Sequence, residues 1–307
     1  MLRVKSQILI LNILIQMKRI IKNIAVFIAS VSLISCGGSG NTATETSADL
    51  AEVKTTMDSS SSVIFYNIPS PLETFTILKM SGSSFDKKVL NPTDKISKYV
   101  SSFSKAANLG AYSTDLSLCF LYKQNQDFNG YLKNINDLTN ALGVDGSYGQ
   151  QVNKRLQTNS NNLDSLMAIV SEAGINADQY LKENQRNSTV ATIAAGGWVE
   201  AMYIITNIAE KSQKKDVIGL VGDQKIVLKN LTNMLEQFVS DPEIKSLLVD
   251  MKDIASVYDN LQEKKGTPIT SDKDIISVGN NTSYELSKEQ LNSILEKITL
   301  LRNKISL

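Results

Sequence analysis

The stretch VATIAAGGWVEAMYIITNIA, residues 190–209, is the feature that most constrains the fold. It has the length of a helix and is apolar on nearly every side. A helix with that profile is stable in water only when other elements cover most of its surface. We therefore place it at the centre of a helical domain.

Apolar residues recur every three or four positions through most of the chain after residue 63, which predicts helices rather than strands. Two β-prone runs around Gly279-Asn280-Asn281 predict a small β-hairpin before the C-terminal helix. The fold class is therefore all-α, a multi-helix bundle around a central apolar helix. The predicted helices lie in IPSPLETFTILKM, from near Asn91 through LSLCFLY, at 126–142, 147–158, 161–173, 175–212 (a pair or one kinked helix), 223–239, 242–263, and after a capping box of Ser287 and Gln290.

The N-terminal segment reads as an export signal. A basic stretch precedes an eleven-residue apolar run, 24–34, which is too short for a membrane span of roughly twenty residues. The order Leu33-Ile34-Ser35-Cys36 resembles the lipobox of bacterial lipoproteins, and this resemblance implies that Cys36 is acylated and becomes the mature N-terminus. An uncleaved anchor helix is the alternative, because ILILNILI at 8–15 adds a second apolar patch.

The domain organisation follows from this signal. Residues 1–35 form the signal peptide, in which Met17 offers an alternative start that would exclude 1–16. Residues 36–62 hold the lipidated cysteine and a flexible tether without aromatic residues, and 63–307 form a single helical domain. Surface-exported lipoproteins often carry acidic residues soon after the cysteine. Because the first one here is Glu45, we expect an outer-membrane anchor that faces the periplasm.

Composition excludes several classes of function. Without the signal peptide the chain has 27 basic and 31 acidic residues, a net charge of −4, which argues against nucleic acid as a partner. The chain contains no histidine, so histidine-based nucleophile systems and histidine metal ligands are excluded. The stretch QNQDFNGYLKNIN imitates a calcium loop but has Asn136 where the loop needs glutamate. We expect neither a metal nor a cofactor, and we expect Cys119 to be a small buried hydrophobe.

A candidate site lies in the central helix. Two adjacent glycines, Gly196 and Gly197, are costly inside a helix and indicate either close approach of a neighbouring helix or a pocket. Gly196, Glu200, Tyr203 and Asn207 follow at spacings of three and four, which forms a polar stripe beside Trp198. A buried carboxylate needs a partner, and Arg186 and Lys105 are the candidates.

Asp115 is a second carboxylate among apolar residues. Two interpretations of these residues remain open. In one, Asp115 and Glu200 form a core hydrogen-bond network with Arg186; in the other, they form the polar floor of a ligand cleft.

The phrases IPSPLET, LNP, KAANLGAYSTDLS, RNSTVATIAAGGWVEAMYI and the terminal LR are similar to a group of uncharacterised, mostly helical lipoproteins and exported proteins of Bacteroidetes-type bacteria. This resemblance implies a fold and a compartment but no activity. The leading hypothesis is a non-enzymatic, membrane-anchored helical module that binds an envelope protein or a small ligand. The alternatives are a carboxylate-dependent hydrolase that uses Asp115 and Glu200, and a nutrient-capture lipoprotein.

Overall fold

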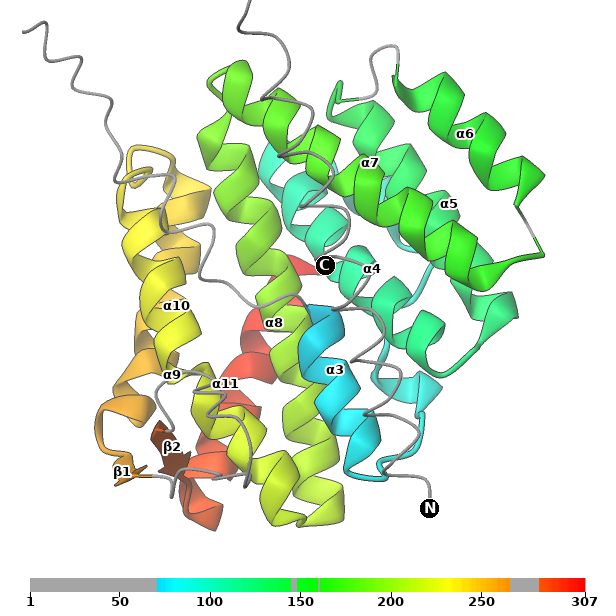
Figure 1. The fold of residues 1–307 in the computed structure, drawn as a ribbon. Coiled ribbons are helices and arrows are strands. Elements are labelled where there is room, and N and C mark those ends of the chain that lie inside the picture. The colour runs from blue at the N-terminus through cyan, green and yellow to red at the C-terminus, as the bar shows by residue number, and fades with distance from the viewer. Residues whose placement is uncertain (1–70, 145–147, 160, 266–281, 307) are drawn as a thin grey trace, which may run out of the picture. The chain divides into compact units, whose positions relative to one another are not determined.

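A computed structural model of the chain describes residues 71–144, 148–159, 161–265 and 282–306, and most of these residues are helical (Figure 1). Apart from a two-stranded sheet just before the last helix, the regular elements in this part of the chain are helices. The predicted all-α class is therefore confirmed. The helices are α3 (Pro71–Met80), α4 (Ser102–Leu121), α5 (Asn125–Ala141), α6 (Tyr148–Thr158), α7 (Leu163–Glu183), α8 (Asn187–Ser212), α9 (Lys215–Glu236), α10 (Pro242–Asp259) and α11 (Lys288–Ile305). Two 3₁₀ turns, η1 (Lys87–Val89) and η2 (Ile96–Lys98), lie between α3 and α4.

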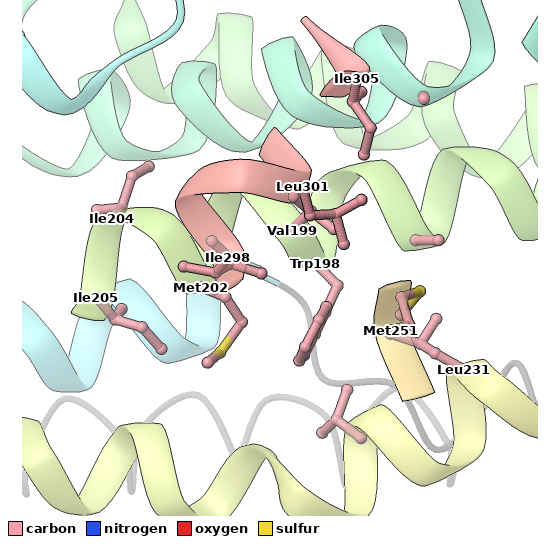
Figure 2. Close-up of a cluster of buried hydrophobic side chains, with 14 of the residues drawn as sticks. Trp198, Val199, Met202, Ile204, Ile205, Leu231, Met251, Ile298, Leu301 and Ile305 are labelled. Atoms are coloured by element: carbon pink, nitrogen blue, oxygen red, sulfur yellow. The ribbon is translucent and has the colours of Figure 1, made fainter. Parts of the chain in front are cut away.

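Helix α8 is the central helix that the sequence predicts. It packs against α4, α9 and α11, and to a smaller extent against α7 and α3. Figure 2 shows Trp198 and Met202 of α8 in the core with Met251 of α10 and Ile298 of α11. Among the described residues, α8 is the one helix long and apolar enough to cross a membrane, and 78% of its most apolar window is buried inside the protein. Its apolar surface is thus covered by neighbouring helices.

Glycines allow α4 and α8 to approach each other closely. A Cβ atom on Gly196 would lie 2.0 Å from the carbonyl oxygen of Ala107 in α4, and one on Gly110 would lie 2.0 Å from that of Ile193 in α8. No side chain fits at such distances. Gly196 therefore serves close helix packing, while a Cβ atom on Gly197 would make a tight contact of 3.3 Å with the carbonyl oxygen of Gly110. Helix α4 runs through Gly110 without a break.

Several helix boundaries differ from the prediction. The second helix begins at Ser102, with Ser101 as its N-cap, and not near Asn91. Helix α7 continues through Gly174 to Glu183, and the break before α8 falls at Gln185, which has a left-handed φ of 58°. The predicted end at 173 therefore lies ten residues too early, and the break falls inside 175–212, the range predicted as a helix pair or one kinked helix.

Helix α9 also begins earlier than predicted and contains both Gly219 and Gly222. A Cβ atom on Gly222 would lie 2.4 Å from the carbonyl oxygen of Tyr284, so this glycine admits the neighbouring strand. The sheet pairs β1 (Gln262–Lys265) with β2 (Thr282–Glu285) in antiparallel register, Gln262 opposite Glu285. The second β-prone run contains β2, whereas the run before Gly279 and the predicted turn lie outside the described residues.

Candidate functional site

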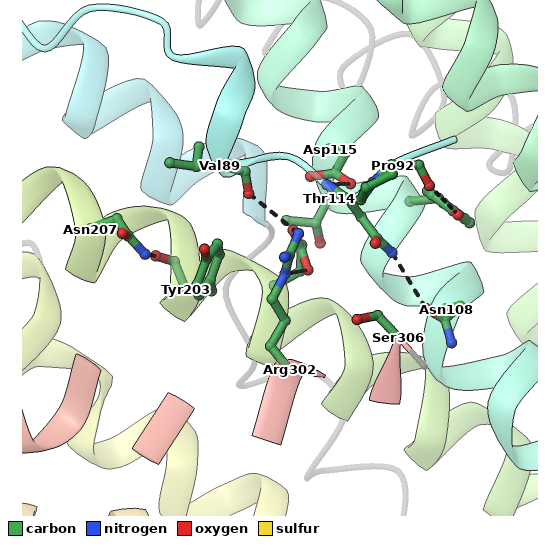
Figure 3. Close-up of polar contacts among 12 residues, drawn as sticks. Val89, Pro92, Asn108, Thr114, Asp115, Tyr203, Asn207, Arg302 and Ser306 are labelled. Carbon is green, nitrogen blue, oxygen red and sulfur yellow. Dashed lines mark hydrogen bonds and ion pairs between the residues drawn. The ribbon is translucent and has the colours of Figure 1, made fainter. Parts of the chain in front are cut away.

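An ion pair joins the central helix to the last helix. Glu200 of α8 accepts two hydrogen bonds from Arg302 of α11, Nε to Oε2 and Nη2 to Oε1, each 2.8 Å long (Figure 3). The guanidinium carbon of Arg302 lies 4.2 Å from the ring centre of Tyr203, one turn further along α8. Both charged side chains are buried, with 1% of Glu200 and 10% of the Arg302 side chain exposed. This geometry is the bidentate fork that suits a desolvated pair.

Asp115 of α4 adds a second carboxyl group to this cluster. It is fully buried, and its Oδ2 accepts a hydrogen bond of 3.1 Å from the backbone N–H of Asn91. Its Oδ1 has no donor, and neither does the buried Oδ1 of Asn91. The cluster therefore holds two carboxyl groups and one guanidinium, and two of its buried oxygens have no donor.

Charge balance assigns a proton to Asp115. Arg302 neutralises Glu200, so an ionised Asp115 would leave one uncompensated charge in the core, which is very costly. Burial, and then the negative charge of Glu200, raise the pKa of Asp115 well above its usual range. A proton on Asp115 also turns it into a donor for acceptors such as the Glu200 carboxylate.

The same cluster holds an irregular piece of chain in the core. Val89 at the end of η1 is buried, and so are Leu90 and Asn91, which follow it and belong to no helix or strand. Their polar backbone groups need partners there. The next two residues, Pro92 and Thr93, are exposed but are bonded in the same way. Side chains of three helices supply the partners: Arg302 donates to the carbonyl of Val89 at 3.3 Å, Tyr131 to Asn91 at 2.9 Å, Tyr112 to Pro92 at 2.8 Å and Asn134 to Thr93 at 2.8 Å.

The structure brings together three of the residues predicted from the sequence, namely Asp115, Glu200 and Tyr203. The predicted cation is wrong, because Arg302 takes the place assigned to Arg186. Arg186 precedes Glu200 by fourteen residues, about 21 Å along a helix, and its Nη1 donates instead to the carbonyl of Leu142 at 2.7 Å. Lys105 is likewise not the partner of Glu200.

Arg302 escaped sequence reasoning although the pattern around it contains a signal. It follows Ile298 by four residues and precedes Ile305 by three, so it falls on the apolar face of the last helix. A charged residue on a buried face needs an opposite charge. The partner's identity depends on how the helices pack.

The remaining predicted residues lie apart from this cluster. Gly196 and Gly197 face α4, where Thr114 donates to the carbonyl of Gly197 at 3.1 Å. Trp198 faces α9, and its Nε1 donates to Gln224 at 3.1 Å. Cys36 lies outside the described residues. The predicted stripe is therefore divided between helix packing and ion pairing.

The cluster has the geometry of a buried polar network. Asp115 and Glu200 do not line the surface groove between α8 and α11 or the hollow formed by residues 87–94 and the first turns of α5. In the described ranges, no group of three or more acidic or cysteine side chains could hold a metal ion. Both carboxyl groups lie in the core, with 0% of Asp115 and 1% of Glu200 exposed.

No protein-family model, curated protein or solved structure matches the chain. Its own residues and their geometry must therefore carry any statement about its function.

Proposed function

We propose that this chain is a lipid-anchored, non-enzymatic helical module of the bacterial cell envelope that binds a partner protein. The N-terminal sequence supports the anchor, since a basic segment, a short apolar run and Cys36 follow one another in lipobox order. Acylation with more than one chain gives stable membrane attachment, whereas a single chain holds a protein only marginally. We place the chain with the helical envelope lipoproteins that its sequence resembles.

The tether sets how far the helical domain can act from the membrane. Residues 37–62 are rich in Gly, Ser, Thr and Ala. A flexible coil of that length spans about 28 Å, from roughly 5 to 6 Å times the square root of residue number. The domain can therefore meet partners that lie close to the membrane surface.

The observation that carries the non-enzymatic part is the burial of the carboxyl groups. A general acid or base must come within hydrogen-bond reach of the substrate. Asp115 is 0% exposed and Glu200 1% exposed, and both are engaged in holding the core together. The hydrolase alternative thus loses the two residues on which it depended, and the ligand-cleft alternative loses its floor.

Cell fractionation tests the anchor. We expect the wild-type protein in the detergent-soluble membrane fraction and Cys36→Ser in the soluble fraction, while Cys119→Ala stays with the membrane as a matched control. A Cys36→Ser variant that remains in the membrane fraction would favour an uncleaved anchor helix. Protease added to intact cells should spare the wild-type protein and cleave it once the outer membrane is permeabilised.

A further inference from the structure

A groove lies on the surface where the C-terminal half of α8 meets α11. Its volume is about 370 Å³. The helices are antiparallel, because Glu200 meets Arg302 while Glu210, further along α8, lines the groove with earlier residues of α11. Those residues are Asn292, Leu295, Glu296, Thr299 and Leu300.

The helix face of α8 that carries Glu200 leads into this groove. Glu200, Tyr203, Asn207 and Glu210 follow one another at spacings of three and four, so they share one helix face. At Glu200 that face is covered by Arg302. At Glu210 it is exposed.

The groove carries two carboxylates without a cation. The lysines of the neighbouring turns are engaged elsewhere: Lys297 pairs with Asp253 and Lys304 with Asp250, both on α10. Lys211, next to Glu210, pairs with Asp86. Within the described part of the chain, Glu210 and Glu296 form no ion pair.

Apolar surface lies beside these carboxylates. Leu300 is 65% exposed, although it belongs to a helix that otherwise turns its large apolar residues inward, and Leu295 is half-buried in the groove wall. Asn292 and Thr299 add a side-chain amide and a hydroxyl group. The groove thus combines an apolar wall with two negative charges and hydrogen-bonding groups.

We propose that this groove binds a basic, amphipathic segment of the partner protein, an inference that rests on the proposed partner-binding function. An aliphatic side chain of the segment packs on Leu295 and Leu300, and its Lys or Arg side chains pair with Glu210 and Glu296. Lysine and arginine suit this setting because their stems cover apolar surface while their charged ends reach a carboxylate. An anionic membrane surface does not fit, since both carboxylates would repel it.

A peptide titration tests the chemistry. The probes are a fluorescent amphipathic peptide of leucine and lysine and its leucine–glutamate counterpart of equal length, added to the full-length protein and followed by anisotropy. We expect the lysine peptide to bind and the glutamate peptide not to bind. The double variant Glu210→Gln, Glu296→Gln should weaken binding by about fivefold or more, as two rim charge pairs imply.

The matched control removes two exposed carboxylates of α7, Asp164→Asn and Glu183→Gln. Glu183 precedes the start of α8, about 35 Å of helix away from Glu210. Affinity should stay within about twofold of wild type in this control. Equal losses in both double variants would mean general charge attraction and would overturn the proposal, as would unchanged binding by the groove variant.

Photo-cross-linking in cells separates this proposal from the proposed function. Benzoylphenylalanine at Leu300 should cross-link a partner protein, and the cross-link should be lost with the two Glu→Gln changes. The same probe at Ile175 of α7, which is 67% exposed, is the comparison position. A partner cross-linked only from Ile175 would overturn the groove and keep the binding module, whereas no cross-linked partner from either position counts against both.

Discussion

Replacing Asp115 by asparagine should stabilise the domain, by an amount that grows with pH. The asparagine side chain has the size of the carboxyl group and stays neutral, as the protonated acid does. Its amide oxygen can accept the hydrogen bond from the backbone N–H of Asn91 that Oδ2 of Asp115 accepts in the wild type. Near pH 4 the two proteins should therefore differ by no more than about 1 kcal/mol, the scale of one hydrogen bond.

The sign follows from the raised pKa of Asp115 in the folded protein. Below the pKa of the unfolded chain, about 3.9, both states hold the proton and the wild type loses nothing. Above it, only the folded state holds the proton, so wild-type stability falls by about 1.4 kcal/mol per pH unit until the folded state also loses the proton. The asparagine variant has no such loss, and its advantage widens over that window.

Urea unfolding of both proteins, followed by far-UV circular dichroism from pH 4 to 8, measures this difference. Shared groups cancel in the comparison. The groups near Asp115 do not interfere, because burial raises the pKa of Cys119 to about 12 and also raises the pKa values of Tyr112 and Tyr131. A difference independent of pH, or a wild type that gains on the variant as pH rises, would refute a protonated Asp115.

Three further predictions concern the core. Arg302→Met should destabilise the domain by about 3 to 5 kcal/mol because it leaves Glu200 buried and unpaired, and adding Glu200→Leu should recover part of that loss in urea unfolding. Gly196→Ala should cost about 3 kcal/mol or more against the backbone of α4, whereas Gly174→Ala, with open space around it, should gain about 0.4 to 1 kcal/mol in the same assay. Cys119 is 0% exposed, so a thiol reagent at pH 8 should modify it only after unfolding, as mass spectrometry of the labelled peptide will report.

Periodicity and capping predicted the helices whose signals are local. The last helix begins at Ser287 with the capping box expected from Ser287 and Gln290, and α10 begins at Pro242 as predicted. The position of α8 followed from its hydrophobicity, because an apolar surface on all sides must be covered whatever covers it. These features require no knowledge of tertiary packing.

The end of α7 differs from the prediction, whereas α4 ends near Tyr122 and α8 ends at Ser212, as predicted. Gln185 follows α7 in a left-handed conformation, a role in which glycine is usual. Gly174 and Gly219, which look like stops, lie inside helices. Glycine alone therefore does not mark a helix end in these two helices.

Only part of the candidate site could be predicted from the sequence. The stripe of Glu200 and Tyr203 is visible in the sequence, but Arg302 is about a hundred residues away, and its pairing depends on how α11 crosses α8. The burial of Asn91 was also invisible, because connecting segments normally run over the surface. That buried segment explains why so many polar side chains enter this core.

The Glu200→Gln variant tests most directly whether the buried network holds the fold together or serves a ligand. Its unfolding free energy should be measured by urea titration. Its affinity for the lysine–leucine peptide should be measured on the same sample under conditions where the variant is folded. We predict a loss of stability of about 3 kcal/mol, because Arg302 is left buried without an opposite charge, together with unchanged peptide affinity. Unchanged stability with lost binding would contradict a structural role and would make Glu200 part of the functional site.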